Sequence, residues 1–301
     1  MNDRTILRLS AGVTALVGFL TFAASAMAQK RYDVGATDTE IKIGNILPYS
    51  GPASAYAVMG KASDAYFRMI NDQGGVNGRK IRFISYDDAY SPPKTVEQAR
   101  RLVESDGVLL LFQPLGTSGN SAIQKYMNAK KTPHLFVASG ATRFGDHKNY
   151  PFTMGFQPNY ESEGRIYAKF ILDNHPRARI GVLYQNDDFG KDTVKGLKAG
   201  LGDKAAMITA EASYEIADPT IDSQIVKLRA SGVDVFVDIA APKFAAQAIK
   251  KLAELNWKPV HILTNVSGSI ATVLKPAGLE NALGIPSTAY TKDPSDPTWD
   301  N

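Results

Sequence analysis

The 301-residue sequence contains no cysteine, which excludes disulfide scaffolds, thiolate metal sites, cysteine nucleophiles and iron–sulfur clusters. It also lacks a dense block of Lys and Arg, and its formal net charge is only +4, so nucleic acid is not indicated as a partner. A Gly-x-Gly-x-x-Gly loop after a strand, a Walker A loop and a nucleophile elbow are missing, and the four histidines lack metal-ligand spacing. These absences predict a protein with no cofactor, no metal and no catalytic residues, and therefore not an enzyme.

Long apolar runs are confined to the N-terminus. Arg4 and Arg8 precede an uncharged stretch over residues 9–28, which ends in the small-x-small pattern Ala26-Met27-Ala28. This order predicts a Sec-type signal peptide over residues 1–28 and a periplasmic location, with a retained membrane anchor as the alternative. No later segment approaches the roughly 20 apolar residues of a membrane span.

The rest of the sequence alternates short apolar runs with amphipathic stretches, the pattern of repeated β-α units around a parallel sheet. Strands are predicted at 41–47, 81–86, 108–112, 134–137, 179–184, 206–214, 233–239 and 259–263, with a strand or crossover at 282–289. Helices are predicted between them, the first over 56–71 with apolar residues at Ala62, Ala65, Tyr66, Met69 and Ile70. The rhythm restarts after residue 156. The sequence therefore predicts an α/β fold of two doubly wound Rossmann-like lobes, 39–155 and 156–285, followed by a return crossover over 286–301.

Three loops that follow predicted strands of the first lobe carry the functional signal. Residues 48–56 contain Ser50-Gly51-Pro52, while 116–119 and 139–142 are rich in Gly, Ser and Thr. Ligands of open α/β sheets bind beyond the carboxyl ends of the strands, and such loops let N–H groups and hydroxyls approach an anion closely. The pattern predicts a site for a carboxylate-sized group, and ordinary capping and turn chemistry is the alternative.

Several segments, in the right order, resemble a known family. They are Ile43-Gly44-Asn45-Ile46-Leu47-Pro48-Tyr49-Ser50-Gly51-Pro52, Ile70-Asn71-Asp72-Gln73-Gly74-Gly75-Val76-Asn77-Gly78-Arg79-Lys80, Tyr86-Asp87-Asp88, Asp187-Asp188-Phe189-Gly190-Lys191-Asp192 and Leu228-Arg229-Ala230-Ser231-Gly232-Val233-Asp234-Val235. The chain is similar, from residue 39 to about 290, to the periplasmic solute-binding proteins of branched-chain amino-acid-type ABC transporters, which are leucine-binding-protein-like.

The resemblance implies the type I periplasmic-binding-protein fold, in which two lobes close around a small ligand held in the cleft between them. It also implies the site residues. Two loops that hold the ligand carboxylate match Gly116, Thr117, Ser118, Ser139, Gly140 and Ala141, and the remaining ligand contacts match Tyr56, Phe189, Ala241 and Asn265. The implied function is capture of a small-molecule ligand and its delivery to the membrane permease subunits of an ABC importer. A ligand-sensing receptor domain of the same fold and an α/β enzyme are the alternatives.

Two positions depart from the family pattern. Asn265 stands where the family has an acid that pairs with the ammonium group of an amino acid, and Ala241 stands where some members have an aromatic ring. An isolated ammonium in a closed cleft needs a counter-charge, which Asp238 is a candidate to supply. The departures suggest that an aromatic or aliphatic carboxylate, or an amide, suits the site at least as well as leucine.

The polar, Pro-rich segment that begins at Lys292 ends at residue 301, whereas family members continue further. The resemblance therefore implies an incomplete first lobe, with an apolar face left uncovered.

Overall fold

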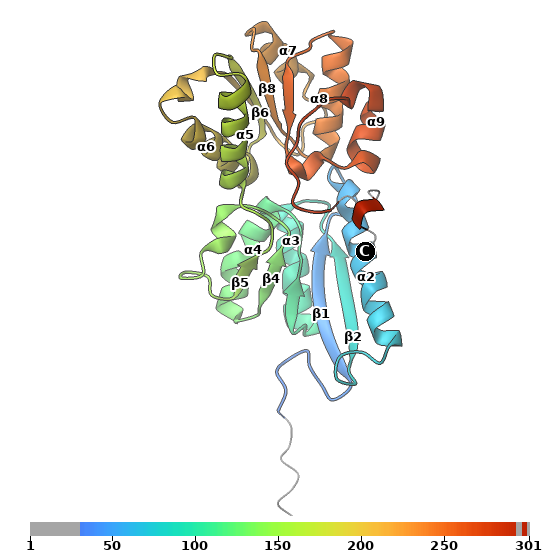
Figure 1. Cartoon of the computed structure of the whole chain (residues 1–301). Coiled ribbons are helices and arrows are strands. Elements are labelled where there is room, and N and C mark those ends of the chain that lie inside the picture. The colour runs from blue at the N-terminus through green and yellow to red at the C-terminus, as the bar shows by residue number, and fades with distance from the viewer. Residues whose placement is uncertain (1–30, 293–296, 300–301) are drawn as a thin grey trace, which may run out of the picture. The chain divides into compact units, whose positions relative to one another are not determined.

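A computed structural model describes residues 31–292 and 297–299 of the chain (Figure 1). The predicted signal peptide, 1–28, lies outside these residues. The chain divides into an N-terminal unit that ends at Asp33 and a compact unit that begins at Val34. Both sheets, their helices and the cavity between them belong to the unit that begins at Val34.

Residues 40–155 carry a five-stranded parallel sheet in the order β2-β1-β3-β4-β5. Its strands are β1 (Glu40–Leu47), β2 (Lys80–Asp87), β3 (Leu110–Phe112), β4 (His134–Val137) and β5 (Thr153–Gly155). Its helices are α2 (Ala57–Asp72), α3 (Pro92–Arg100) and α4 (Thr117–Lys130). Since β2 and β3 flank β1 on opposite sides, the strand order reverses between β1 and β3, and the loops at the carboxyl ends of these strands diverge there.

Residues 160–263 carry a four-stranded parallel sheet in the order β7-β6-β8-β9, which repeats the reversal around its first strand. Its strands are β6 (Ile180–Gln185), β7 (Ile208–Tyr214), β8 (Val235–Ile239) and β9 (Val260–Leu263). Its helices are α5 (Tyr160–Asn174), α6 (Asp188–Leu201), α7 (Asp222–Ala230), α8 (Pro242–Glu254) and the short α9 (Lys275–Ala277). One buried cluster packs α5 and α6 on one face of the sheet, and a second packs α7 and α8 on the other. The α/β fold of two doubly wound halves is as predicted.

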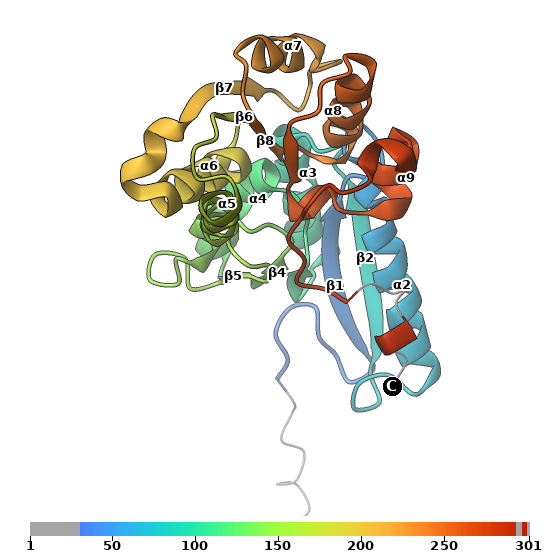
Figure 2. The same cartoon turned by 45° about the horizontal axis from the view of Figure 1, so that its top comes forward.

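The two faces of the first sheet are covered unequally. On one face, α3 and α4 form a buried cluster around Ile46, Leu111 and Ile123. On the other face α2 lies alongside β1 and β2 (Figure 2), and the packing there is a row of rings. Phe67 of α2 contacts Phe83 and Phe112 at centroid distances of 5.3 and 5.5 Å. The row continues through Phe136 to Phe156, which is 60% exposed.

The side of helix α2 that packs on the sheet is not the side predicted from its apolar residues. Tyr66 is 57% exposed and Met69 is 45% exposed, whereas Phe67 meets the strands. Residues about one turn apart share a helix face, so Gly60, which is buried, marks the same side as Phe67. Apolar residues on two neighbouring stripes made the inward stripe ambiguous in the sequence.

The expected strand or crossover at 282–289 forms no strand. Ser287 makes one isolated parallel bridge to Leu263, and the Leu263 N–H donates to the Pro286 carbonyl over 3.0 Å. Pro286 has no N–H group, so a ladder cannot extend through it. The segment instead runs past the end of β9 as an extended strap. The predicted strand 206–214 is shortened at its start, because a 3-10 turn ends at Met207.

Candidate functional site

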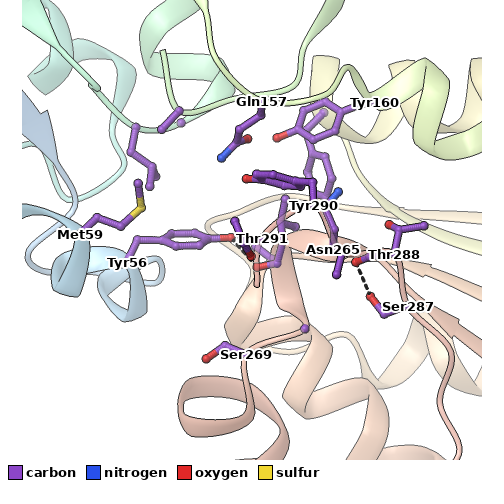
Figure 3. A pocket seen from close by; sticks show the side chains of 18 of the residues that line it. Tyr56, Met59, Gln157, Tyr160, Asn265, Ser269, Ser287, Thr288, Tyr290 and Thr291 are labelled. Atoms are coloured by element: carbon purple, nitrogen blue, oxygen red, sulfur yellow. Dashed lines mark hydrogen bonds between the residues drawn. The ribbon is translucent and has the colours of Figure 1, made fainter. Parts of the chain in front are cut away.

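A cavity of about 700 Å³ lies where the strand-end loops of the two sheets meet. Figure 3 shows its lining: Tyr56 and Met59 project from the start of α2, Tyr160 from the start of α5, and Tyr290 from the strap that follows β9. Of the ten predicted site residues, those that line the cavity are Tyr56, Gly116, Thr117, Phe189, Ala241 and Asn265. The other four, Ser118, Ser139, Gly140 and Ala141, lie behind the wall.

The wall of the first lobe is built on the start of α4. Gly116 has φ +107° and a Cβ there would lie 2.8 Å from the Tyr90 ring, so only glycine lets the tyrosine pack against the loop. The N-cap residue of α4 is Gly116, so no N-cap side chain accepts hydrogen bonds from the N–H groups of the first turn. Thr117 and Ser139 are both buried, and their hydroxyls share a 2.7 Å hydrogen bond. An uncapped helix start beside a cavity offers N–H groups and a positive dipole end to an anion.

The wall of the second lobe is built on the start of α6, which is capped. Asp187 accepts hydrogen bonds from the N–H groups of Phe189 and Gly190 and from the Gln185 amide. Ser118 of the first lobe donates to the same carboxylate over 2.8 Å. Burial raises the pKa of Asp187, and these donors oppose the rise. The carboxylate already satisfies the α6 terminus, so the α4 terminus is the better place for a bound anion.

Further contacts join the two lobes around the cavity. Asp192 accepts from the Thr142 N–H and hydroxyl over 2.8 and 2.9 Å. Arg143 pairs with Asp188 over 3.0 Å. On the opposite rim, the Tyr56 hydroxyl donates to the Val266 carbonyl over 3.2 Å. Hydrogen bonds and an ion pair therefore join the two lobes on more than one side of the cavity.

Residues 140 and 141 support the wall indirectly. The Gly140 carbonyl accepts the Tyr160 N–H over 2.8 Å, and a Cβ at Gly140 would lie 2.5 Å from the Pro158 carbonyl oxygen. Ala141 is buried in the cluster under α5 and α6. These two residues fix the position of the start of α5 by hydrogen bonding and packing, and so place Tyr160 at the cavity.

Several lining residues were missed by reasoning from the sequence. Tyr160 packs on Phe189 at a centroid distance of 4.8 Å, and Tyr290 projects across the cavity between Tyr160 and Asn265 (Figure 3). Tyr90 and Gln185 also line it. Burial raises the pKa of Tyr90 and Tyr160, so both present neutral phenols at physiological pH. Tyr90 and Gln185 follow or end strands of the two sheets, so the strand-end rule that found Gly116 applies to them equally.

Asp238 does not supply the counter-charge considered for it. It is fully buried in β8, where one carboxylate oxygen lies 3.2 Å from His261 Nε2, and it is absent from the cavity lining. Burial raises its pKa. Among residues 31–292 and 297–299, the structure shows neither a cluster of three or more His, Asp or Glu suited to a metal nor a helix able to cross a bilayer.

Comparisons with known proteins agree with this architecture. The sequence profile of the periplasmic binding proteins matches residues 40–299. The Leu/Ile/Val-binding protein homolog 1 of Brucella suis is 25% identical over 283 residues, which are 90% of this chain and 71% of the relative.

Two solved structures share the fold. A substrate-binding periplasmic protein from Ralstonia solanacearum is 26% identical with a TM-score of 0.74, over 81% of this chain and 68% of that one. A fatty acid ABC transporter substrate-binding protein from Thermomonospora curvata is 23% identical with a TM-score of 0.71, over 83% of this chain and 64% of that one.

Proposed function

Because the chain belongs to the periplasmic binding protein family, we propose that it captures a small carboxylate-bearing ligand in the cavity between its lobes. The ligand leaves chemically unaltered. The observation that carries the proposal is the cavity itself, whose lining comes from strand-end loops of both sheets and whose rims are joined by hydrogen bonds between the lobes. Ligands of doubly wound sheets bind at such loops.

The two ends of the cavity suit different parts of one ligand. The uncapped start of α4, with Gly116 and Thr117, suits the carboxylate. The rings of Tyr56, Phe189 and Tyr160 suit an apolar body, because burial of apolar surface is the main source of affinity in such a site. The contacts between the lobes then form as the halves close on the ligand by a hinge movement.

The cellular role follows from this capture step. In our proposal the chain works in the periplasm, after export by the signal peptide expected over residues 1–28, and passes its ligand to the permease subunits of an ABC importer. The names of relatives, among them the Leu/Ile/Val-binding protein homolog of Brucella suis, support ligand binding over catalysis. The chain spans 64 to 71% of the length of the proteins named above, so the delivery step is part of the proposal.

Calorimetry on protein stripped of bound ligand tests this function. Leucine and 4-hydroxybenzoate represent amino acids and aromatic acids, and their amide or ester derivatives, which lack the carboxylate, are the matched controls. We expect saturable binding of one carboxylate per chain and loss of binding with its neutral derivative. Equal affinity for a carboxylate and its ester would contradict the proposal.

A further inference from the structure

A buried carboxylate stands directly behind the cavity wall. Glu163 of α5 is only 4% exposed, and it gathers donors from three segments. It accepts from the Tyr167 hydroxyl, from the Thr264 hydroxyl over 3.1 Å and from the Thr288 hydroxyl over 3.1 Å. From Asn265 it accepts both the backbone N–H over 2.8 Å and the side-chain amide over 2.5 Å. A buried charge requires this kind of full hydrogen bonding.

These contacts determine which way the Asn265 amide is turned. An ionised carboxylate only accepts hydrogen bonds, so the amide nitrogen of Asn265 must face Glu163. Asn265 lines the cavity, whereas Glu163 does not. The amide oxygen, Oδ1, is therefore the polar atom turned to the cavity. Within the described residues, Oδ1 accepts no hydrogen bond from the protein.

The geometry points to Glu163 as the positioning residue that sets what the ligand must carry beside its carboxylate. Resting on the function proposed above, we infer that the ligand presents a hydrogen-bond donor, an ammonium or a hydroxyl, to Asn265 Oδ1. The Glu163 charge lies one amide group behind this oxygen and strengthens its attraction for a donor. A plain carboxylic acid of the same shape would leave Oδ1 desolvated and unpartnered.

This inference revises the ligand class suggested by the sequence. An asparagine in place of an acid argued against an ammonium group, because an amide carries no charge. In the structure the carboxylate of Glu163 lies directly behind Asn265. The negative charge is therefore present, and it acts on the ligand through the Asn265 amide. Tyr290 lies beside Asn265 in the cavity (Figure 3). Its pKa is raised by burial and by the nearby negative charge of Glu163, so the charge of Glu163 also acts on this part of the cavity.

Three ligands with one carbon skeleton separate these possibilities: leucine, its hydroxy analogue leucic acid, and isocaproate, which has only hydrogen at that carbon. For the wild-type chain, calorimetry should show leucine or leucic acid bound about tenfold to a hundredfold more tightly than isocaproate. In Glu163→Gln the new side chain can itself donate, the Asn265 amide is free to turn, and this ratio should fall to about one. Isocaproate that binds the wild-type chain as tightly as leucine and leucic acid would overturn the inference.

Two further variants test whether the preference for a donor depends on the oxygen that residue 265 turns to the cavity. Combining Glu163→Gln with Asn265→Asp reverses the direction of the hydrogen bond and again turns an oxygen to the cavity, so the preference for a donor should return. Asn265→Ala keeps the Thr264 and Thr288 bonds of Glu163 but removes the acceptor, and should abolish the preference. Glu161→Gln is the matched control, because Glu161 lies two residues away on α5 and pairs with Lys195 instead. It should leave the ratio unchanged.

The amide orientation is also measurable without ligand. In nuclear magnetic resonance spectra, the Asn265 side-chain N–H bonded to a carboxylate should resonate downfield, and it should move upfield in Glu163→Gln but not in Glu161→Gln. An unmoved resonance would overturn the inferred orientation alone. Failure of every carboxylate to bind the wild-type chain would overturn the proposed function, and with it the ligand class, whatever the resonance shows.

Discussion

At the scale of single residues, the hydroxyl pair of Thr117 and Ser139 has two unequal members. Both are buried and hydrogen bonded to each other, but only Thr117 lines the cavity. Ser139 also accepts the Ala141 N–H over 3.2 Å, so its hydroxyl holds the loop together. The proposed ligand carboxylate therefore contacts the Thr117 hydroxyl directly, whereas Ser139 acts on the ligand only through its hydrogen bond to Thr117.

Replacing the two residues should separate binding from stability. Thr117→Val keeps the shape and removes the hydroxyl, and should weaken ligand binding by about 1–3 kcal/mol. Ser139→Ala should lower the free energy of unfolding by about 1 kcal/mol and weaken binding less than Thr117→Val does. Calorimetry and denaturant unfolding of both variants check this division. A larger loss of affinity in Ser139→Ala than in Thr117→Val would reverse the two roles.

At the scale of elements, the start of α4 is anchored to β4 through buried polar groups. The Asn120 amide donates to the carbonyls of Pro114 and Gly116, and its oxygen lies 2.7 Å from His134 Nε2. Since that oxygen can only accept, the His134 ring carries its proton on Nε2. Nδ1 has no partner within the described part of the chain. Burial lowers the pKa of His134 to about 3.

This pKa predicts a pH dependence of stability. In the unfolded chain His134 takes up a proton near pH 6.5, while in the fold it stays neutral to about pH 3. The unfolded state therefore binds more protons between these values, and the free energy of unfolding should fall by up to about 1.4 kcal/mol per pH unit as the pH drops below 6.5.

Denaturant unfolding at several pH values measures this slope. His134→Gln should reduce it over the same window. His147→Gln, a change at an exposed histidine, is the control and should keep the wild-type slope. Identical pH profiles for the wild-type chain and His134→Gln would contradict the account of the α4 anchor.

At the scale of the whole molecule, the row of rings on the α2 side of the first sheet leaves an apolar surface in contact with water. Tyr66 and Phe156, near the two ends of the row, are more than half exposed. Exposed apolar side chains such as these favour association.

This surface predicts self-association of the purified chain. Sedimentation velocity should show species that grow with protein concentration, and the double change Tyr66→Ser with Phe156→Ser should reduce them. Val226→Ser is the control, since Val226 is an exposed apolar residue of α7 outside the row. A wild-type chain that stays monomeric at all concentrations, or an equal effect of the control, would count against this surface.

Features set by local periodicity could be predicted from the sequence, whereas features set by packing between distant segments could not. Apolar runs located every described strand except the three-residue β5. The position of ligand sites at strand ends pointed to Gly116 and Thr117, which line the cavity. Both predictions were possible because both signals are local in the sequence. Tyr290 reaches the cavity only because its strap turns back past β9. The role of Glu163 depends on hydrogen-bond donors about a hundred residues away in the sequence. No local sequence pattern distinguishes this residue from other acidic residues.

Native mass spectrometry of the protein, after exposure to a mixture of small carboxylates and removal of unbound compounds, tests directly whether the cavity captures such a ligand. We expect one carboxylate to be retained per chain and to be recovered with unchanged mass on denaturation. We also expect Gly116→Ala to lose the retained compound, because a Cβ there would displace the Tyr90 ring from the cavity wall. A chain that retains no carboxylate, or that releases it chemically altered, would contradict the proposed capture of an unaltered ligand.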